Sequence, residues 1–285
     1  MSPEAPDVLA DVALQVVGEA SEAANRWLLR LRCGEGVAAK DGNSADVVTD
    51  LDRTLDALIR LRLGQLRPSD GIVSEEGEDV PGTSGIIWVC DPVDGSASLV
   101  RGGGSWAISL AATICGETVA GVVCNVEADE TYVAIRGGGA TVDGWPIWVS
   151  AAATLAESVV ATDFAHDRAL RASQAEVLGR VAERARAVRN VGSTALHLCW
   201  VASGRLDGMW QTTCKWWDLA AAGLCVTEAG GVLSDLAGGP MRPESFIACA
   251  PGIHRELVEA AASGGLYQRA EQARFGQHLP TIGGN

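Results

Sequence analysis

The residues best suited to chemistry lie together in 91–96, where the chain reads Asp-Pro-Val-Asp-Gly-Ser. An uncharged apolar run, 86–90, comes directly before them and predicts a short buried strand. Pro92 fixes its own φ and restricts the preceding residue to extended backbone. We therefore expect the strand to stop and the chain to turn at this point.

In such a turn the carboxylates of Asp91 and Asp94 can converge on one point, and the carbonyl of Val93 can join them. Three hard oxygen donors suit Mg²⁺, which binds through one or two carboxylates together with substrate phosphate. The backbone N–H groups of Gly95 and Ser96 would hold an anion if a helix begins there. The alternative is an Asx-rich turn without any ligand.

Three more acidic residues lie at the ends of predicted elements. Glu75 follows a strand at 72–74, Asp52 lies in the first turn of a helix, and Asp218 opens another helix. Taken singly, each has an ordinary structural explanation: an exposed acid, an acid stabilised by the helix dipole, or an N-cap. Together with the carboxylates of 91–96 they predict a single acidic centre.

Composition limits the class of protein. The chain has 285 residues, 47% of them hydrophobic, which suits one large domain or two intimate halves and excludes a disordered protein. A formal net charge of −14 argues against a nucleic-acid polymer as partner. The sequence has no apolar run long enough for a membrane span and no signal-peptide pattern, so we expect no membrane partner. The eight cysteines form no C-x-x-C pair, and we interpret them as reduced residues of a cytoplasmic protein.

Residues 1–150 are predicted to form an N-terminal α+β half with most of the candidate ligands. Helical spacing of apolar residues predicts helices over 7–32 and from about 49 to 67, separated by a mobile loop or loose hairpin. An antiparallel meander should follow the central strand, with strands at 106–115, 119–126 and 131–135 and a tight hairpin at Asp143-Gly144.

Residues 151–285 change to alternating strands and helices, which predicts a C-terminal α/β half with Asp218 and the substrate-side residues. Ser193 is expected to cap the second of its helices. The predicted strands lie at 159–164, 187–191, 206–211, 232–235 and 246–250, and the predicted helices at 167–186, 193–202, 217–229 and 253–262.

Taken together, these motifs resemble those of the inositol monophosphatase family. The stretch 91–96 is similar to its Asp-Pro-Ile/Leu-Asp-Gly-Thr/Ser signature, and 217–221 with 227–231 is similar to its second signature. Three further motifs occur in the family's order with similar gaps: Val48-Thr49-x-x-Asp52, Glu75-Glu76 and Gly192-Ser193-Thr194-Ala195-Leu196. The similarity covers roughly residues 8 to 262.

This resemblance implies an α+β fold, a layered α-β-α-β-α sandwich of the sugar-phosphatase type. It also implies hydrolysis of a phosphate monoester by a water that two to three Mg²⁺ ions activate. By resemblance, Glu75, Asp91 and the Val93 carbonyl hold one ion. A second ion is held by Asp91, Asp94 and Asp218, and a third by Glu75 with waters.

The resemblance also assigns roles around the metals. Glu75 and Ser96 would orient the attacking water, with Thr49 and Asp52 steering it from a second layer. Lys40 would lie on a loop that closes over the third metal. Contacts with substrate are assigned to Asp94, Gly95, Ser96, Gly192, Ser193, Thr194, Gln211 and Asp218.

Two departures from the family bear on the substrate. After Gly95-Ser96 the family reads x-Asn-Phe, whereas this chain has Ala97-Ser98-Leu99. Seven residues before Asp218, inositol-active members carry a Glu that binds ring hydroxyls, whereas this chain has Gln211, unless that residue simply ends a strand and faces water. We therefore expect a small cyclitol, polyol or sugar phosphate as substrate, with inositol itself in doubt. A phosphatase for histidinol phosphate or phosphoadenosine phosphate, or a silent member that acts as a binding protein, are the alternatives.

The expected partners are a small phosphorylated substrate and a second copy of the chain. Members of the family usually dimerise. The meander between Trp106 and Val126, with Trp145 and Trp148 nearby, offers more apolar surface than one sheet face needs.

Overall fold

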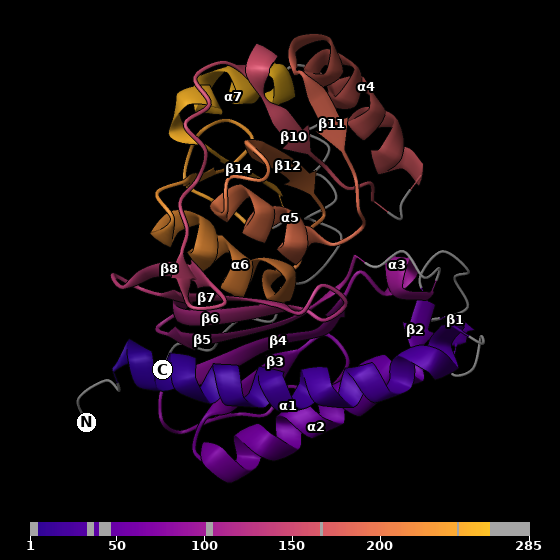
Figure 1. The fold of residues 1–285 in the computed structure, drawn as a ribbon, viewed down its shortest axis with the longest axis vertical. Coiled ribbons are helices and arrows are strands. Elements are labelled where there is room, and N and C mark those ends of the chain that lie inside the picture. The colour runs from indigo at the N-terminus through magenta and orange to yellow at the C-terminus, as the bar shows by residue number, and fades with distance from the viewer. Residues whose placement is uncertain are drawn as a thin grey trace.

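The computed structural model describes residues 5–32, 37–39, 47–100, 105–165, 168–243 and 245–262, and of residues 29–32, 37–39, 47–49, 169 and 262 the backbone alone. The elements of this part stack in five layers, which Figure 1 shows edge-on. Two helices cover the outer face of a seven-stranded sheet, two lie between it and a five-stranded sheet, and two cover the far face of the second sheet. The predicted α-β-α-β-α sandwich is confirmed.

The larger sheet contains the central strand and the meander. In spatial order its strands are β3 (Gly71–Ser74), β4 (Ile86–Asp94), β5 (Ala107–Ile114), β6 (Glu117–Asn125), β7 (Glu130–Ile135), β8 (Gly139–Val142) and β9 (Trp145–Pro146). Strand β3 is parallel to β4, and every later pair is antiparallel. The β8–β9 turn holds Asp143 and Gly144 at φ 50° and 79°, the left-handed values that a tight two-residue hairpin requires.

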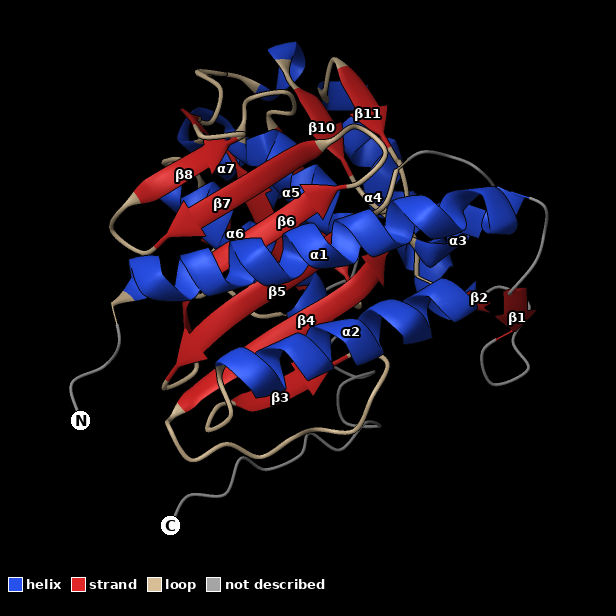
Figure 2. Cartoon of the chain, turned by 60° about the horizontal axis from the view of Figure 1, so that its bottom comes forward, coloured by secondary structure: helices blue, strands red, loops and turns tan. Residues whose placement is uncertain are grey.

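Two long amphipathic helices cover the outer face of this sheet, as Figure 2 shows: α1 (Pro6–Arg32) and α2 (Asp50–Leu66). Leu9, Val16 and Ala20 of α1 lie at helical spacing and are fully buried, and they belong to the apolar pattern that predicted this helix. Of the two alternatives for the segment between the helices, the hairpin is supported, because β1 (Val37–Ala39) pairs antiparallel with β2 (Val47–Thr49).

The smaller sheet follows from the C-terminal half. Its strands, in spatial order, are β11 (Ala187–Arg189), β10 (Val159–Ala161), β12 (Gly208–Thr212), β14 (Ser245–Cys249) and β13 (Val232–Ser234). Its outer face carries α4 (Arg168–Arg184) and α7 (His254–Ala262), and its inner face carries α5 (Thr194–Ala202) and α6 (Trp216–Glu228). Short 3₁₀ turns occur at Leu155–Glu157 and Pro251–Ile253. Strand β10 ends three residues earlier than predicted, which frees Asp163 and Phe164 from the sheet.

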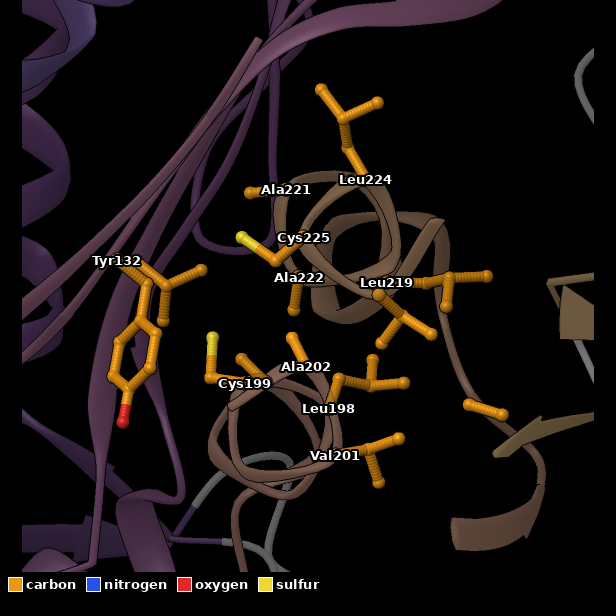
Figure 3. Close-up of a cluster of buried hydrophobic side chains, with 14 of the residues drawn as sticks. Tyr132, Leu198, Cys199, Val201, Ala202, Leu219, Ala221, Ala222, Leu224 and Cys225 are labelled. Carbon is orange, nitrogen blue, oxygen red and sulfur yellow. The ribbon is translucent and has the colours of Figure 1, made fainter. Parts of the chain in front are cut away.

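The two predicted halves share one hydrophobic core. Figure 3 shows Tyr132 of β7 facing Cys199 of α5 and Cys225 of α6. Helix α6 can lie close to the sheet because Gly121 of β6 has no side chain: a Cβ there would come within 2.8 Å of the Ala221 Cα. The boundary drawn at residue 150 stays a prediction, since this core is continuous across it.

The prediction that the central strand stops at Cys90 is wrong. Strand β4 continues to Asp94, and its pairing with β5 slips between Asp91 and Asp94. Pro92 lies in this bulge, where a residue needs no N–H for the hydrogen bonds between the strands. Asp91 and Asp94 stay paired, with Ser109 and Ala107, and the extra residue between them places both on the same face of the sheet. The donors expected in a turn at 91–96 are therefore brought together inside an extended strand.

The meander cannot be the free surface that the sequence indicated. Strands β5 and β6 are buried along nearly their whole length, because α1 covers one face and α6 the other. Trp145 and Trp148, 76% and 69% exposed, are the large apolar side chains that stand out in this region. Separately, none of the helices that the structure describes combines the length and apolar character needed to cross a bilayer.

Candidate active site

Parallel pairing of β3 with β4 brings the first two acidic residues together. Ser74 is the register partner of Cys90, so Glu75, which follows β3, lies beside Asp91 of β4. The Glu75 N–H donates to the Cys90 carbonyl at 3.2 Å, which extends the pairing by one bond. Two carboxylates 16 positions apart in sequence are thereby brought side by side.

Helix α6 supplies the third carboxylate. Asp218 occupies its first turn, where its Oδ2 accepts from the Lys215 N–H at 3.0 Å and so caps the helix. One carboxylate oxygen from each of Glu75, Asp91 and Asp218 lies within 4.8 Å of the other two. The N-cap is thus Lys215 and not Asp218, contrary to the structural alternative for that residue; Asp218 lies at the third helical position, where one side chain both completes the cap and belongs to the acidic centre.

Asp94 joins this centre from the side of the C-terminal half. Its Oδ2 accepts from the Ser193 hydroxyl and from the Ala195 N–H, both at 2.6 Å. Ser193 in turn caps α5 by accepting from the Leu196 N–H at 3.2 Å, as predicted. Asp94 lines the same cavity as the three clustered carboxylates but lies outside their 4.8 Å group.

The next residues close the turn against the other half. Gly95 has φ 103°, and a Cβ there would lie 2.9 Å from the Gly192 carbonyl oxygen, so only glycine fits. Helix α3 (Ser96–Val100) begins immediately afterwards, so the condition set for anion binding by the Gly95 and Ser96 N–H groups is met. The Ser96 hydroxyl lies 3.2 Å from Asp52 Oδ1 and 3.1 Å from the Val93 carbonyl oxygen, linking the turn to the first turn of α2.

Burial and mutual repulsion perturb these acids. Loss of hydration raises the pKa of Asp91 well above its ordinary value, and the neighbouring carboxylates, Glu75 first, raise the pKa further. Burial likewise raises the pKa of Asp94, with Asp218 as the next cause. Burial also raises the pKa of Asp218, although its capping hydrogen bond opposes the shift. Ionised together, the carboxylates need positive charge between them.

A cavity of about 460 Å³ opens over these carboxylates. Its lining includes Glu75, Asp91, Val93, Asp94, Gly95, Ser96, Gly192, Thr194, Gln211 and Asp218 from the sequence-predicted set. Ser193 and Asp52 are buried behind it, at 0% and 2% exposure, so they support lining residues. Lys40 and the side chain of Thr49 lie outside the described residues. The roles assigned to all of these residues by resemblance stay predictions.

Several lining residues were missed by the sequence reasoning, chiefly Asp163, Phe164 and Asn190. Asp163 carried the same signal as Glu75 and Asp91, an acid at the end of a predicted strand, but its strand was drawn through residue 164. Gln211 does not face water, because it is only 7% exposed. Its Oε1 accepts from the Asp163 N–H at 3.3 Å, and its Nε2 donates to the Thr194 hydroxyl at 3.4 Å.

The donor set fits a hard divalent cation. Carboxylate oxygens are the ligands that Mg²⁺ prefers, and the 4.8 Å spread among Glu75, Asp91 and Asp218 allows several of them to face one ion. The raised pKa values of the buried aspartates show that this arrangement is costly when the acids are charged and uncompensated. A cation at the cavity floor would relieve that cost.

Comparison with known proteins places the chain in a family. A model of the inositol monophosphatase family matches residues 8–272. The inositol-1-monophosphatase of Mycobacterium bovis is 36% identical over 90% of this chain and 91% of its own length. That of Rhizobium meliloti is 37% identical over 75% and 82%. The extragenic suppressor protein SuhB of Bartonella henselae superposes with a TM-score of 0.85 at 32% identity, covering 90% of this chain and 99% of that structure. The chain therefore belongs to the inositol monophosphatase family and is a phosphoric monoester hydrolase.

Proposed function

We propose that this enzyme uses Mg²⁺ to hydrolyse the phosphate monoester of a small cyclitol, polyol or sugar. The observation that carries the proposal is the convergence of Glu75, Asp91 and Asp218 within 4.8 Å at the floor of a cavity of about 460 Å³. Such a cavity holds a phosphorylated ring but not a polymer. The described cysteines are all free thiols, which supports the reducing cytoplasm as the location.

Each part of the site has a task in this reaction. Bound Mg²⁺ would lower the pKa of a water and offset charge on the phosphoryl oxygens. Glu75 would hold that water, and the pairing that keeps its backbone beside Asp91 supports this role. The Ser96 hydroxyl bridges Asp52 and the Val93 carbonyl, so its orientation is set before substrate binds. Gly95 lines the cavity, and its backbone N–H, with that of Ser96, would bind the phosphate.

A panel of esters tests the proposal directly. Purified full-length protein with Mg²⁺ is assayed for phosphate release from inositol 1-phosphate, glucose 6-phosphate, fructose bisphosphate, histidinol phosphate and phosphoadenosine phosphate. A preference for a cyclitol or sugar ester supports the proposal, whereas a preference for either of the last two favours the alternative. Release from none of them by folded protein would contradict phosphatase function.

Gln211→Glu is expected to raise kcat/KM for inositol 1-phosphate relative to the enzyme's preferred ester. A glutamate can still accept from the Asp163 N–H and can accept from the Thr194 hydroxyl, so both hydrogen bonds survive. It adds a charged acceptor, and bonds to charged groups are worth about 1.5–3 kcal/mol against about 1 for neutral ones. Competing both esters in one reaction measures the ratio. An unchanged ratio would show that residue 211 takes no part in the choice.

We propose that the enzyme is a homodimer, with Trp145 and Trp148 in the interface. These side chains are 76% and 69% exposed at one end of the larger sheet. Two tryptophans exposed to water this close together are unusual in a monomer. Light scattering at micromolar concentration should give twice the chain mass, and the double variant Trp145→Glu with Trp148→Glu should give the single mass. Leu61→Glu on α2, where leucine is 58% exposed, is the control and should leave the dimer intact. A monomeric wild type would refute the proposal.

A further inference from the structure

We infer that Asp163 is a specificity-determining residue, whose carboxylate accepts hydrogen bonds from hydroxyl or ammonium groups on the non-phosphate part of the substrate, and that His197 positions it. The inference rests on the proposed function and concerns the cavity wall away from the clustered carboxylates. Asp163 and Phe164 follow β10 and line the cavity.

His197 fixes the Asp163 side chain from behind. The histidine is fully buried in α5, and its Nδ1 lies 3.0 Å from Asp163 Oδ2. Its Nε2 accepts from the Val191 N–H at 3.2 Å, so the proton of the neutral ring must be on Nδ1, facing the carboxylate. Both atoms are buried and neither makes a hydrogen bond of regular geometry with the described residues, so the 3.0 Å contact between them is the polar interaction that the structure gives each one.

Two buried glutamines hold the backbone of the same segment. Gln174, 2% exposed, accepts from the Ala165 N–H at 2.8 Å and donates to the Asp163 carbonyl at 3.2 Å. Gln211 accepts from the Asp163 N–H at 3.3 Å. Three buried polar side chains, these two amides and the imidazole, thus direct hydrogen-bonding groups at residues 163–165. Three buried polar side chains that hold one short segment outside any strand indicate that the position of this segment on the cavity wall is important.

The fixed carboxylate keeps one oxygen for a ligand. Oδ2 is buried against His197, yet the Asp163 side chain is 13% exposed and borders the cavity, so Oδ1 is the oxygen that can meet substrate. The amide of Gln211 is occupied at both ends, which leaves Asp163 as the charged acceptor on this wall. Phe164, 39% exposed beside it, offers apolar surface to ring carbons.

The complementary ligand is therefore a ring or chain that bears hydrogen-bond donors. A carboxylate accepts strongly from hydroxyls and from ammonium groups and repels phosphate. The reactive phosphate must lie over Glu75, Asp91 and Asp218, so the donors must belong to the alcohol part of the ester. Asp163 would select which alcohol is accepted without taking part in bond cleavage.

Asp163→Asn tests the inference, with Asp129→Asn as the control. Asp129 also carries one negative charge, lies outside the cavity lining, and has φ 55°, which asparagine tolerates. The substrates are inositol 1-phosphate and glucose 6-phosphate, which bear hydroxyls, and propyl phosphate, which bears none. Loss of a charged acceptor should lower kcat/KM for at least one hydroxylated ester by about 10- to 100-fold, mainly through KM. Propyl phosphate should change by less than about threefold.

His197 is tested by a pair of variants. Glutamine can accept from the Val191 N–H and donate to Asp163, so His197→Gln should keep the preference for hydroxylated esters, whereas His197→Leu should lose it through KM with little change in kcat. Melting temperatures identify any variant that merely unfolds. Equal effects of Asp163→Asn on all three esters, or none on any, would overturn the inference. Hydrolysis of no ester by the wild type would instead sink the proposed function and the inference with it.

Discussion

Removal of divalent cations is expected to abolish turnover and to lower the melting temperature by about 5–10 °C relative to protein in saturating Mg²⁺. The pKa of Asp91 is raised by burial and then by neighbouring carboxylates, so its charged form costs free energy in the folded protein. A cation bound only by the folded state removes that cost and adds its own binding free energy.

The sign of the pH dependence follows from the same shift. An acid whose pKa is raised on folding destabilises the protein above that raised pKa and has no such effect below its ordinary pKa. The loss of folding stability that the charged forms of Asp91 and Asp94 cause therefore grows as pH rises. The affinity for a cation also grows, because the cation competes with protons for these carboxylates. Calorimetry in chelator and in Mg²⁺ should show a gap in melting temperature that widens from about pH 5 to pH 8. Full activity in excess chelator would contradict the proposed chemistry.

Asp91→Asn is expected to lower kcat by at least 10- to 100-fold, because even the loss of an outer partner of a metal ligand commonly costs that much. Asparagine keeps an oxygen that can accept from the Val93 N–H, the 2.9 Å bond that Asp91 Oδ1 makes now. The amide nitrogen would then face the acidic cluster, where a donor cannot bind a cation. The backbone turn should survive while the site loses a ligand.

The matched control for this variant is Asp70→Asn. Asp70 is also a buried aspartate, which accepts from Trp88 Nε1 at 2.9 Å and pairs with Arg67, but it does not line the cavity. Its substitution should lower the melting temperature and leave kcat within about twofold. The variants are assayed at a temperature where both remain folded. If Asp70→Asn lost as much turnover as Asp91→Asn, the loss at Asp91 could not be ascribed to a missing ligand.

The equivalent change at Asp94 would be harder to interpret. From sequence, Asp94 ends a strand and belongs to no core. In the structure it is 8% exposed and accepts from Ser193 and Ala195 across the two halves. Asp94→Asn can keep these bonds only if its oxygen faces Ser193, so an effect on turnover could come from assembly as well as from chemistry.

Local patterns determined much of this protein from sequence alone. The spacing of apolar residues located α1 and α2, because a helix with 3.6 residues per turn buries residues three to four positions apart, whatever it packs against. Ser193 was identifiable as a cap because capping needs only the next three residues. The donors of 91–96 were recognisable because they are contiguous, although the chain there is a bulged strand and not the predicted turn. These features depend on interactions within a few residues of each other.

Tertiary structure decided the rest, because it depends on pairings between distant segments. Parallel register places Glu75 beside Asp91, and the packing of α6 brings Asp218 to both. A bulge in the pairing with β5 accommodates Pro92 within strand β4, which the sequence predicted to end before this residue. The contact between Asp163 and His197 joins a strand end to a helix interior 34 positions later, and no periodicity or spacing encodes it. Local sequence thus identified the candidate ligands one by one, and long-range packing brought them together and placed Asp163 on the cavity wall.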